Sequence, residues 1–442
     1  MLDFIREYRI LIIATIIVAF TGWLLPIVSY ILVPLIFILF IAKGHHKEVL
    51  LFFYVILVFS DNPDMFFAKK IKPLLILIFT LFTVKNSNLW AGNKVFKSFA
   101  IFFSYTILLL LLSPNTLVAF QKNLSYILLF LTIPGYVTYL IDREGPKILL
   151  DMVNFSILIL LIGIVLIPIF PNMVYSHGGR LHGLLGNPNG LAMMCFFNFI
   201  LFQLFKDTFS EMNILSRINN ITIIIVIIFT LYLTGSRTSW ISVLIFLFFR
   251  QFSGISPTIS LVIMLFVVLV YDYVFIIGLT IVDQLGLNNQ LRIADGAESV
   301  ENASGRTVAW RFAWEEIQKN MFFGRGWAYD EYWIFGPIQK TLNVLNHQGG
   351  VHNVYLILWL NTGAVGLLLY LFSLTQLFFN AAKNSGLALP ILFACLFVAN
   401  FEPWLAASLN PFTIQFIICI AVILHIPEIN YEDQNHVEIV KV

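Results

Sequence analysis

Long apolar runs follow one another along most of this sequence, and they restrict its fold more than any other feature. Each run has roughly 16 to 24 residues, the length that a helix needs to cross about 30 Å of hydrocarbon. Hydrophobic residues make up 59% of the chain and charged residues 11%, and the mean hydropathy is +0.89. A transmembrane β-barrel would instead show alternating segments of about ten residues. The sequence therefore predicts an all-α polytopic membrane protein.

The apolar runs predict about fourteen transmembrane helices. Twelve is the alternative count, because the third and fourth runs are short and only Pro26 separates the first two. There is no repeated block and no low-complexity linker, so we expect a single integral membrane domain over residues 1–442. The candidate spans are 9–25, 27–42, 48–60, 71–84, 98–113, 123–141, 149–170, 188–205, 218–234, 238–252, 258–281, 351–379, 386–401 and 408–427.

Lysine and arginine in the short loops indicate the orientation of these spans. If the N-terminus with Arg6 and Arg9 is cytoplasmic, most other basic loops and the C-terminus are cytoplasmic too. The exception is the basic stretch 69–72, which this topology places outside. The loops at 171–187, 234–237 and 282–350 then open on the extracytoplasmic face.

The long loop 282–350 contains a segment with helical periodicity, Thr307–Asn320. Trp310, Trp314 and Ile317 recur on one face of this segment, with charged residues elsewhere. We therefore expect an amphipathic helix that lies on the membrane surface or covers a cavity.

Three arginines in the outward-facing loops are candidates for a binding site, because arginine near hydrocarbon is costly unless it is paired or faces water. Arg180 lies in GRLHGLLGNPNGLA, Arg237 in the short break LTGSRTSWIS, and Arg306 just before the surface helix. Snorkelling is the alternative explanation for Arg180, and an ion pair with the long loop is the alternative for Arg237. Arg306 has no local partner, whereas Arg311 stands four residues before Glu315, the spacing of an intrahelical ion pair.

His352 and Asn353 stand where the long loop re-enters the membrane, on the same predicted face as the arginines. A neutral imidazole at this place could take a proton from a hydroxyl group. The planar guanidinium of arginine suits phosphate oxygens. Together these residues predict a site for a lipid-linked diphosphate that carries sugars.

Other classes of site and partner have little support. The three cysteines lie inside apolar runs and suggest neither a metal site nor disulfides. The carboxylates of the long loop, from Asp283 to Glu301, lack the spacing of metal ligands. A net charge of +2 is too small to indicate a nucleic-acid partner.

The order of four motifs resembles the superfamily of bacterial O-antigen polymerases and O-antigen ligases. The motifs are GRLHGLLGNPNGLA, LTGSRTSW, SGRTVAWRFAWEEIQKNMFFGRGW and VHNVYLILWLNTGAVGLLLYL, which lie between Gly179 and Leu371. The resemblance implies a metal-independent glycosyltransferase without a cofactor and with a GT-C-like helical fold. It also implies a multi-pass protein of the bacterial inner membrane, with a long periplasmic loop and an active site that faces the periplasm.

The resemblance also implies roles for individual residues. Arg237 and Arg306, and more loosely Arg180, would bind the lipid diphosphate, and His352 would be the catalytic base. Supporting residues would be Asn353, Arg311 and Tyr355. The substrates would be a donor and an acceptor oligosaccharide, both linked to undecaprenyl diphosphate and surrounded by membrane lipids, and a chain-length regulator protein is a candidate partner.

Within the superfamily we favour a polymerase, because Val354 and Tyr355 follow the His-Asn pair where ligases tend to carry an acidic residue. The alternative is a ligase that transfers the glycan to the lipid A core. A lipid-linked oligosaccharide flippase or transporter is a less favoured alternative, since it would be expected to show an internal repeat and cations deep within the spans.

Overall fold

The computed structural model describes residues 2–85, 93–176, 178–209, 217–252, 257–269, 306–345, 349–406 and 409–439, with single positions at 280, 284 and 286. Within these ranges the regular elements are helices, and an isolated bridge joins Tyr175 to Leu181. Each of the predicted apolar runs overlaps a helix. Most of the first half of the long loop, including Asp283 and the acidic residues up to Glu301, lies outside the described residues.

Five helical stretches in the described ranges are long and apolar enough to cross a membrane, by length and composition: Lys94–Leu112, Thr116–Glu144, Lys147–Val165, Pro188–Thr208 and Val354–Ala381. Shorter apolar helices accompany them, among them Arg9–Leu24 and Pro26–Ala42. The chain is therefore an all-helical membrane protein. The count of fourteen crossings and the orientation of the termini stay predictions.

The chain divides into two compact units. Residues 1–97, 124–234 and 407–442 form the first unit, and residues 98–123 and 235–406 form the second. Two of the four points of division fall inside helices, one in α7 (Lys94–Leu108), which the short η2 (Leu109–Leu112) extends, and one in α8 (Thr116–Glu144).

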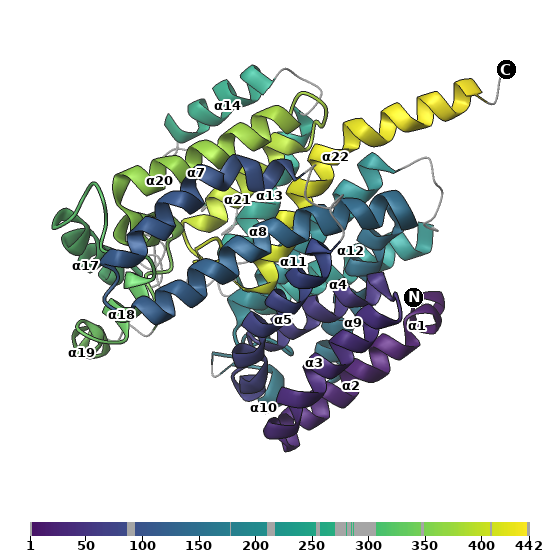
Figure 1. The fold of residues 1–442 in the computed structure, drawn as a ribbon, viewed down its shortest axis with the longest axis horizontal. Helices are drawn as coiled ribbons and strands as arrows, with labels where there is room; N and C mark the ends of the chain where they lie inside the picture. Colours follow the sequence, from purple (N-terminus) through teal and green to yellow (C-terminus); the bar gives the residue numbers. More distant parts are fainter. Residues whose placement is uncertain are drawn as a thin grey trace. The chain divides into compact units, whose positions relative to one another are not determined.

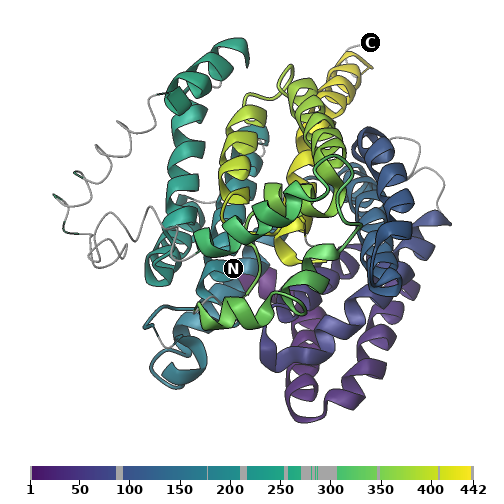
Figure 2. The same ribbon diagram turned by 90° about the vertical axis from the view of Figure 1, so that its left-hand side faces the viewer.

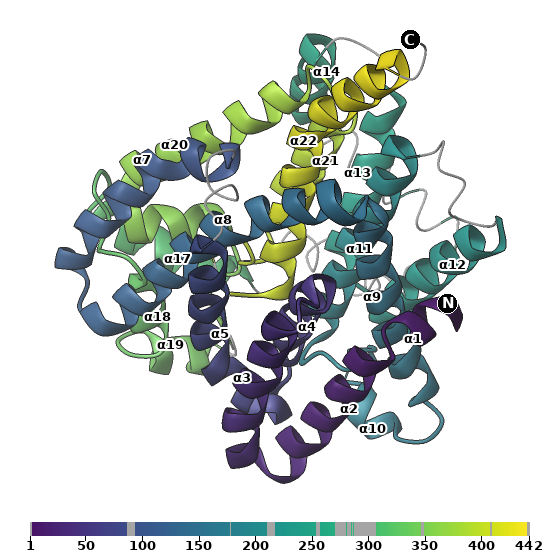
Figure 3. The ribbon, with the colours of Figure 1, turned by 45° about the vertical axis from the view of Figure 1, so that its right-hand side comes forward.

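The first unit contains two groups of packed helices. In one group, α2 (Arg9–Leu24) and α3 (Pro26–Ala42) pack beside α4 (His46–Phe59) and α5 (Phe66–Val84) (Figure 3). In the other, α11 (Pro188–Thr208) contacts α9 (Lys147–Val165), α12 (Arg217–Thr234) and α22 (Pro411–Ile439). The short helices α1 (Leu2–Glu7), η1 (Pro63–Met65) and α10 (Pro171–Val174) complete the unit.

Helix α11 forms the core of the first unit, and almost all of its side chains from Gly190 to Phe205 are buried. Polar side chains join it to its neighbours inside the apolar interior. Gln415 of α22 donates to Asn198 of α11 at 3.3 Å, and Tyr54 of α4 bonds Ser156 of α9 at 3.1 Å. Such bonds between helices stabilise packing in a membrane, where the helices gain little from the hydrophobic effect.

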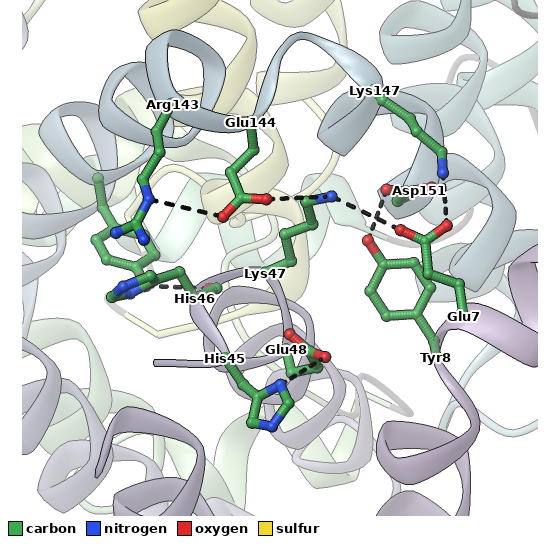
Figure 4. Close-up of polar contacts among 11 residues, drawn as sticks. Glu7, Tyr8, His45, His46, Lys47, Glu48, Arg143, Glu144, Lys147 and Asp151 are labelled. Carbon is green, nitrogen blue, oxygen red and sulfur yellow. Dashed lines mark hydrogen bonds and ion pairs between the residues drawn. The ribbon is translucent and has the colours of Figure 1, made fainter. Parts of the chain in front are cut away.

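A network of charged side chains ties together helix ends in the first unit (Figure 4). Lys47, at the start of α4, lies 3.6 Å from Glu7 and 3.4 Å from Glu144, the last residue of α8. Lys147, at the start of α9, also pairs with Glu7, at 2.5 Å. The hydroxyl of Tyr8 donates to Asp151 at 2.6 Å. The ends of α1, α4, α8 and α9 are therefore held by one set of ion pairs.

The basic stretch 69–72, which the sequence placed in an outer loop, lies in the first two turns of α5. Lys72 Nζ donates to Ser60 Oγ at 3.2 Å and to the carbonyl of Leu409 at 2.5 Å. Lys70 lies over the ring of Phe66, with 5.3 Å between Nζ and the ring centroid. The predicted span 71–84 therefore began too late, because these lysines belong to the helix. Lys72 binds a backbone carbonyl and a hydroxyl oxygen inside the unit.

The second unit is built around two pairs of packed helices. Helix α13 (Arg237–Gln251) lies along α21 (Ala388–Ala399) (Figure 1). Helix α17 (Arg306–Gln318) packs on α20 (Val354–Ala381), which also contacts α18 (Tyr329–Ile334) and α21. Figure 2 shows α17, α18 and α19 (Gln339–Val344) in green beside α20. Helix α14 (Pro257–Leu269), most of α7, η2 and the start of α8 also belong to this unit.

The predicted amphipathic helix is present as α17, but its buried face differs from the predicted one. Ala309, Ala313, Glu316 and Ile317 are buried, whereas Trp314 is partly exposed. Ala313 and Ile317 pack in an apolar cluster with residues of α18 and α20, including Ile334 and Ile357. The small alanines allow α17 to lie close to α20, and this close approach turns the tryptophans to the edge of the contact.

Helix α20 is broken at Gly363, where φ is 67° and ψ is −178°. The segment 321–326 fills the break with its backbone: Ala364 N donates to Met321 O at 2.8 Å, and Arg325 N donates to Leu360 O at 2.9 Å. A Cβ atom on Gly363 would lie 2.1 Å from Phe322 O. The backbone groups that the break releases thus find partners in the long loop, as a buried backbone requires.

Gly363→Ala should destabilise the protein, because alanine at this φ and ψ costs about 1–3 kcal/mol and the added Cβ also overlaps the segment 321–326. Thermal unfolding of the purified protein in detergent measures the effect. Gly44→Ala is the matched control, since Gly44 has a φ of +70° but no atom within 4 Å of an added Cβ. A Gly363 variant no less stable than the Gly44 variant would contradict the proposed close packing.

Candidate functional site

Arg306 is the first residue of α17, and it pairs with a carboxylate that the sequence did not suggest. Its Nη2 atom lies 2.6 Å from Glu402 Oε1, and the two side chains are only 14% and 10% exposed. Glu402 follows α21 in the segment NFEPW, 96 residues along the chain. The pair shields a guanidinium that would otherwise be costly to bury. The signal in the sequence was a single acidic residue in the short turn between the last two apolar runs.

His352 has an unusual backbone, with a φ of 51°. Within the described residues, Ala328 is the other non-glycine residue with a positive φ. Such strain often accompanies function when the surrounding structure enforces it. Here, Trp310 Nε1 of α17 donates to the carbonyl of Val351 at 2.8 Å and thereby fixes the residue before His352.

The imidazole of His352 is half-buried, with its Nδ1 atom enclosed by protein. A Cβ atom on Gly349 would lie 2.8 Å from Nε2, so the ring rests directly against the chain that leads into it. The carbonyl bond from Trp310 and this contact together hold the ring in place. A side chain with little freedom is what a positioned proton acceptor requires.

Asn353 and Tyr355, which the resemblance suggested as supporting residues, have structural contacts. Asn353 caps α20, since its Oδ1 accepts from Leu356 N at 3.0 Å. The hydroxyl of Tyr355 donates to the carbonyl of Leu396 at 2.7 Å and so joins α20 to α21. Asn353 therefore determines where the helix after His352 begins.

Arg237 begins α13, with Ser236 at the cap position. The arginine is half-buried, and its Nη1 atom is enclosed by protein. Since α13 packs along α21, Arg237 lies on a helix that contacts the one leading into Glu402. A cation at the first turn of a helix adds to the positive end of the helix dipole, which favours anions.

Arg311 does not form the predicted ion pair with Glu315 within the described structure. Its guanidinium lies over the ring of Phe312, 5.4 Å from the centroid, and the side chain is exposed. An arginine that precedes an acidic residue by four positions is in the weaker orientation for such a pair, and this accounts for the difference.

Glu316, which the sequence places among the charges off the apolar face, is a buried anchor of the second unit. It accepts from Lys319 Nζ at 2.6 Å and from the Tyr329 hydroxyl at 2.9 Å, and it pairs with Arg325 at 2.9 Å. Burial raises the pKa of the Glu316 carboxyl, but the two hydrogen bonds and the Arg325 charge outweigh burial and bring this pKa below its ordinary value. Burial and the bond to Glu316 raise the pKa of Tyr329 to about 12.

Arg180 belongs to the first unit, where it ends a short bridged turn. Its Nε donates to the carbonyl of Thr234 at 2.6 Å, and its Nη2 donates to Asn189 Oδ1 at 2.7 Å. Thr234 is the last residue of α12, so the guanidinium also lies at the negative end of that helix dipole. In this arrangement Arg180 connects the ends of α12 and α11.

Asp61 and Asn62 hold the chain that leads from Arg180 to α11. Asn62 Nδ2 donates to Leu184 O at 3.0 Å, and the Asp61 carboxylate accepts from Gly186 N. Burial raises the pKa of the Asp61 carboxyl, against the opposing effects of the Lys72 charge and the Gly186 bond. No local pattern in the sequence predicts this contact, because 125 positions separate Asp61 from Gly186.

The second unit thus contains three of the four predicted principal site residues, Arg237, Arg306 and His352, and adds Glu402 to them. Arg180 lies in the first unit. Among the residues that the structure describes, no group of three or more His, Cys, Asp or Glu side chains could hold a metal ion. The arrangement offers cationic groups for an anion and an imidazole for proton transfer.

A family model described as O-antigen ligase matches residues 222–371 of the chain. The matched region includes Arg237, Arg306 and His352, and it begins after Arg180. A search of curated proteins found no match. The family match confirms, over residues 222–371, the resemblance to the superfamily of O-antigen polymerases and ligases seen in the sequence.

Proposed function

We propose that this protein is a polysaccharide polymerase of the bacterial inner membrane, with its active site facing the periplasm. A hydroxyl oxygen of the acceptor, a repeat unit on undecaprenyl diphosphate, attacks the anomeric carbon of the donor glycan. The bond between that carbon and the donor diphosphate breaks, and the hydroxyl proton passes to His352. Donor and acceptor are both lipid-linked, so membrane lipids surround the reaction and a chain-length regulator is a candidate partner.

The observation that carries this proposal is the bond from Trp310 to the carbonyl of Val351. It joins the helix that begins with Arg306 to the residue before His352, and Val351 packs in the same apolar cluster as Ala313 and Ile317 of that helix. Glycosyl transfer from a diphosphate needs both functions, one for the leaving group and one for the attacking hydroxyl.

Arginines can stabilise the leaving diphosphate without a metal ion. Negative charge grows on the diphosphate as the glycosidic bond breaks, so a fixed guanidinium binds the transition state more tightly than the ground state. In the structure Glu402 neutralises Arg306 and directs its Nη2 atom. We propose that Arg306 and Arg237 bind the diphosphate, and Arg180 is a further candidate for this role.

The second candidate is an O-antigen ligase that transfers the glycan to the lipid A core, as the description of the matched family suggests. Purified protein with lipid-linked repeat units and lipid A core in detergent tests the choice. A ladder of lengthening glycans supports the polymerase. Transfer to lipid A core without a ladder would establish the ligase, and translocation in vesicles without either product would establish the transporter instead.

Arg306→Ala should lower turnover by at least ~10²-fold, the scale expected for loss of one partner of the transition-state charge. Arg306→Lys should recover part of this loss, because lysine retains the charge but not the planar pair of donors. Initial rates of glycan elongation at equal protein concentration measure both effects. Arg311→Ala is the matched control, since Arg311 is an exposed arginine on the same helix. Normal elongation by Arg306→Ala would remove Arg306 from the mechanism.

His352→Ala should lower kcat by ~10²- to 10⁴-fold and leave binding of the lipid-linked donor nearly unchanged, as expected for a general base. Separate measurements of donor binding and elongation distinguish this loss from a loss of affinity. Tyr355→Phe is the control on the same helix, and it should lower stability by about 1 kcal/mol through loss of the bond to Leu396 while turnover is kept. If His352→Ala elongates normally, another group must accept the proton.

A further inference from the structure

Two phenylalanines of the segment 321–326 are exposed although Gly324 and Gly326 of the same segment are buried. Phe322 is 65% exposed and Phe323 is 63% exposed. The same segment fills the break in α20, where Val365 N donates to Phe322 O at 3.2 Å. The backbone of the segment is therefore fixed to a membrane helix while its two rings point away from the protein.

These rings adjoin apolar surface that belongs to helices long enough to span a membrane. The hydroxyl of Tyr105, on α7, donates to Thr362 O at 3.0 Å, so α7 touches α20 at the break. Exposed apolar residues continue from there along both helices: Ile101 and Leu108 on α7, and Leu368 and Phe372 on α20. An exposed apolar surface on a membrane-spanning helix is the surface that lipid chains contact.

The length of α20 beyond the break places its end near the edge of the hydrocarbon. The stretch from Ala364 to Ala381 is about 27 Å long at 1.5 Å per residue, which is close to the hydrocarbon thickness of about 30 Å. The part before the break, Val354–Thr362, packs instead with α17 and α18. Gly363 and the segment that fills the break therefore lie where the span of α20 begins.

The surroundings of the two rings have the composition of a membrane interface. Trp314 and Trp359 meet edge to face with 5.3 Å between ring centroids, and Trp359 Nε1 donates to Met321 O at 2.9 Å. Lys319 is 62% exposed beside them. Tryptophan rings and long basic side chains concentrate at the level of the lipid headgroups.

We propose that the segment 321–326 is an interfacial anchor that inserts Phe322 and Phe323 among the lipid acyl chains at the end of the α20 span. The exposed area of two such rings is on the order of 300 Å², whereas a stable protein interface needs about 800 Å² from each partner. The lipid bilayer is thus the partner that fits. This inference rests on the membrane location of the chain and not on the reaction that it catalyses.

Spin labelling of the full chain in lipid vesicles tests the anchor. Nitroxides at Phe322→Cys and Phe323→Cys should show a several-fold higher ratio of oxygen to aqueous nickel-chelate collisions than a nitroxide at Lys319→Cys. A label at Leu368→Cys gives the reference for lipid exposure. The native cysteines Cys195, Cys395 and Cys419 are buried, so the unmodified protein should take up little label and serves as the background.

Two outcomes would overturn the proposal. Ratios at 322 and 323 equal to that at Lys319→Cys would place the rings in water. Low collision rates with both reagents would instead show that protein, such as a second copy of the chain, covers the rings. Because the measurement does not involve substrate, a negative result for the anchor would not contradict the proposed glycosyl transfer. A protein without transfer activity would likewise not contradict the anchor.

Discussion

The break in α20 at Gly363 is the constraint on which the second unit depends. A helix that stops inside or beside a membrane exposes backbone groups that lipid cannot satisfy. The segment 321–326 supplies the missing partners on both sides of the break, for Leu360 and for Ala364. The chain before this segment is α17 and the chain after it is α18. The break therefore positions both helices against α20 and, through the bond from Trp310 to Val351, the segment that carries His352.

Electrostatics adds a second requirement, because Arg306 is mostly buried. An isolated guanidinium in that position would lose much of its hydration, and Glu402 compensates for the loss. Under the proposed mechanism, phosphate oxygens would provide the same compensation when substrate binds. Because a guanidinium has five N–H donors, the phosphate can bind beside Glu402 and need not replace it. Glu402 is therefore needed to stabilise the buried Arg306, and it need not take part in the reaction directly.

Local patterns in the sequence were sufficient to predict the helices and the family, but they did not predict contacts between distant residues. Apolar runs determine where helices occur, since every backbone group in lipid must be satisfied within its own segment. The pairing of Glu402 was not predicted because its partner lies 96 residues away. The break at Gly363 was not predicted because a glycine in an apolar run is also compatible with a continuous helix. The buried face of α17 was misjudged because tryptophan dominates any count of apolar residues, whereas close packing here uses alanine.

The contact of Tyr355 bears on how polymerases and ligases differ. The Tyr355 hydroxyl donates to the carbonyl of Leu396, so this residue contributes to the packing of α20 on α21. The Tyr355 hydroxyl can still accept a hydrogen bond, but its proton is already donated to Leu396. Both reactions would share the arginines and the histidine, because both expel the same diphosphate and deprotonate a sugar hydroxyl. We therefore expect the choice of acceptor to depend on the surface that approaches His352 from outside the helix.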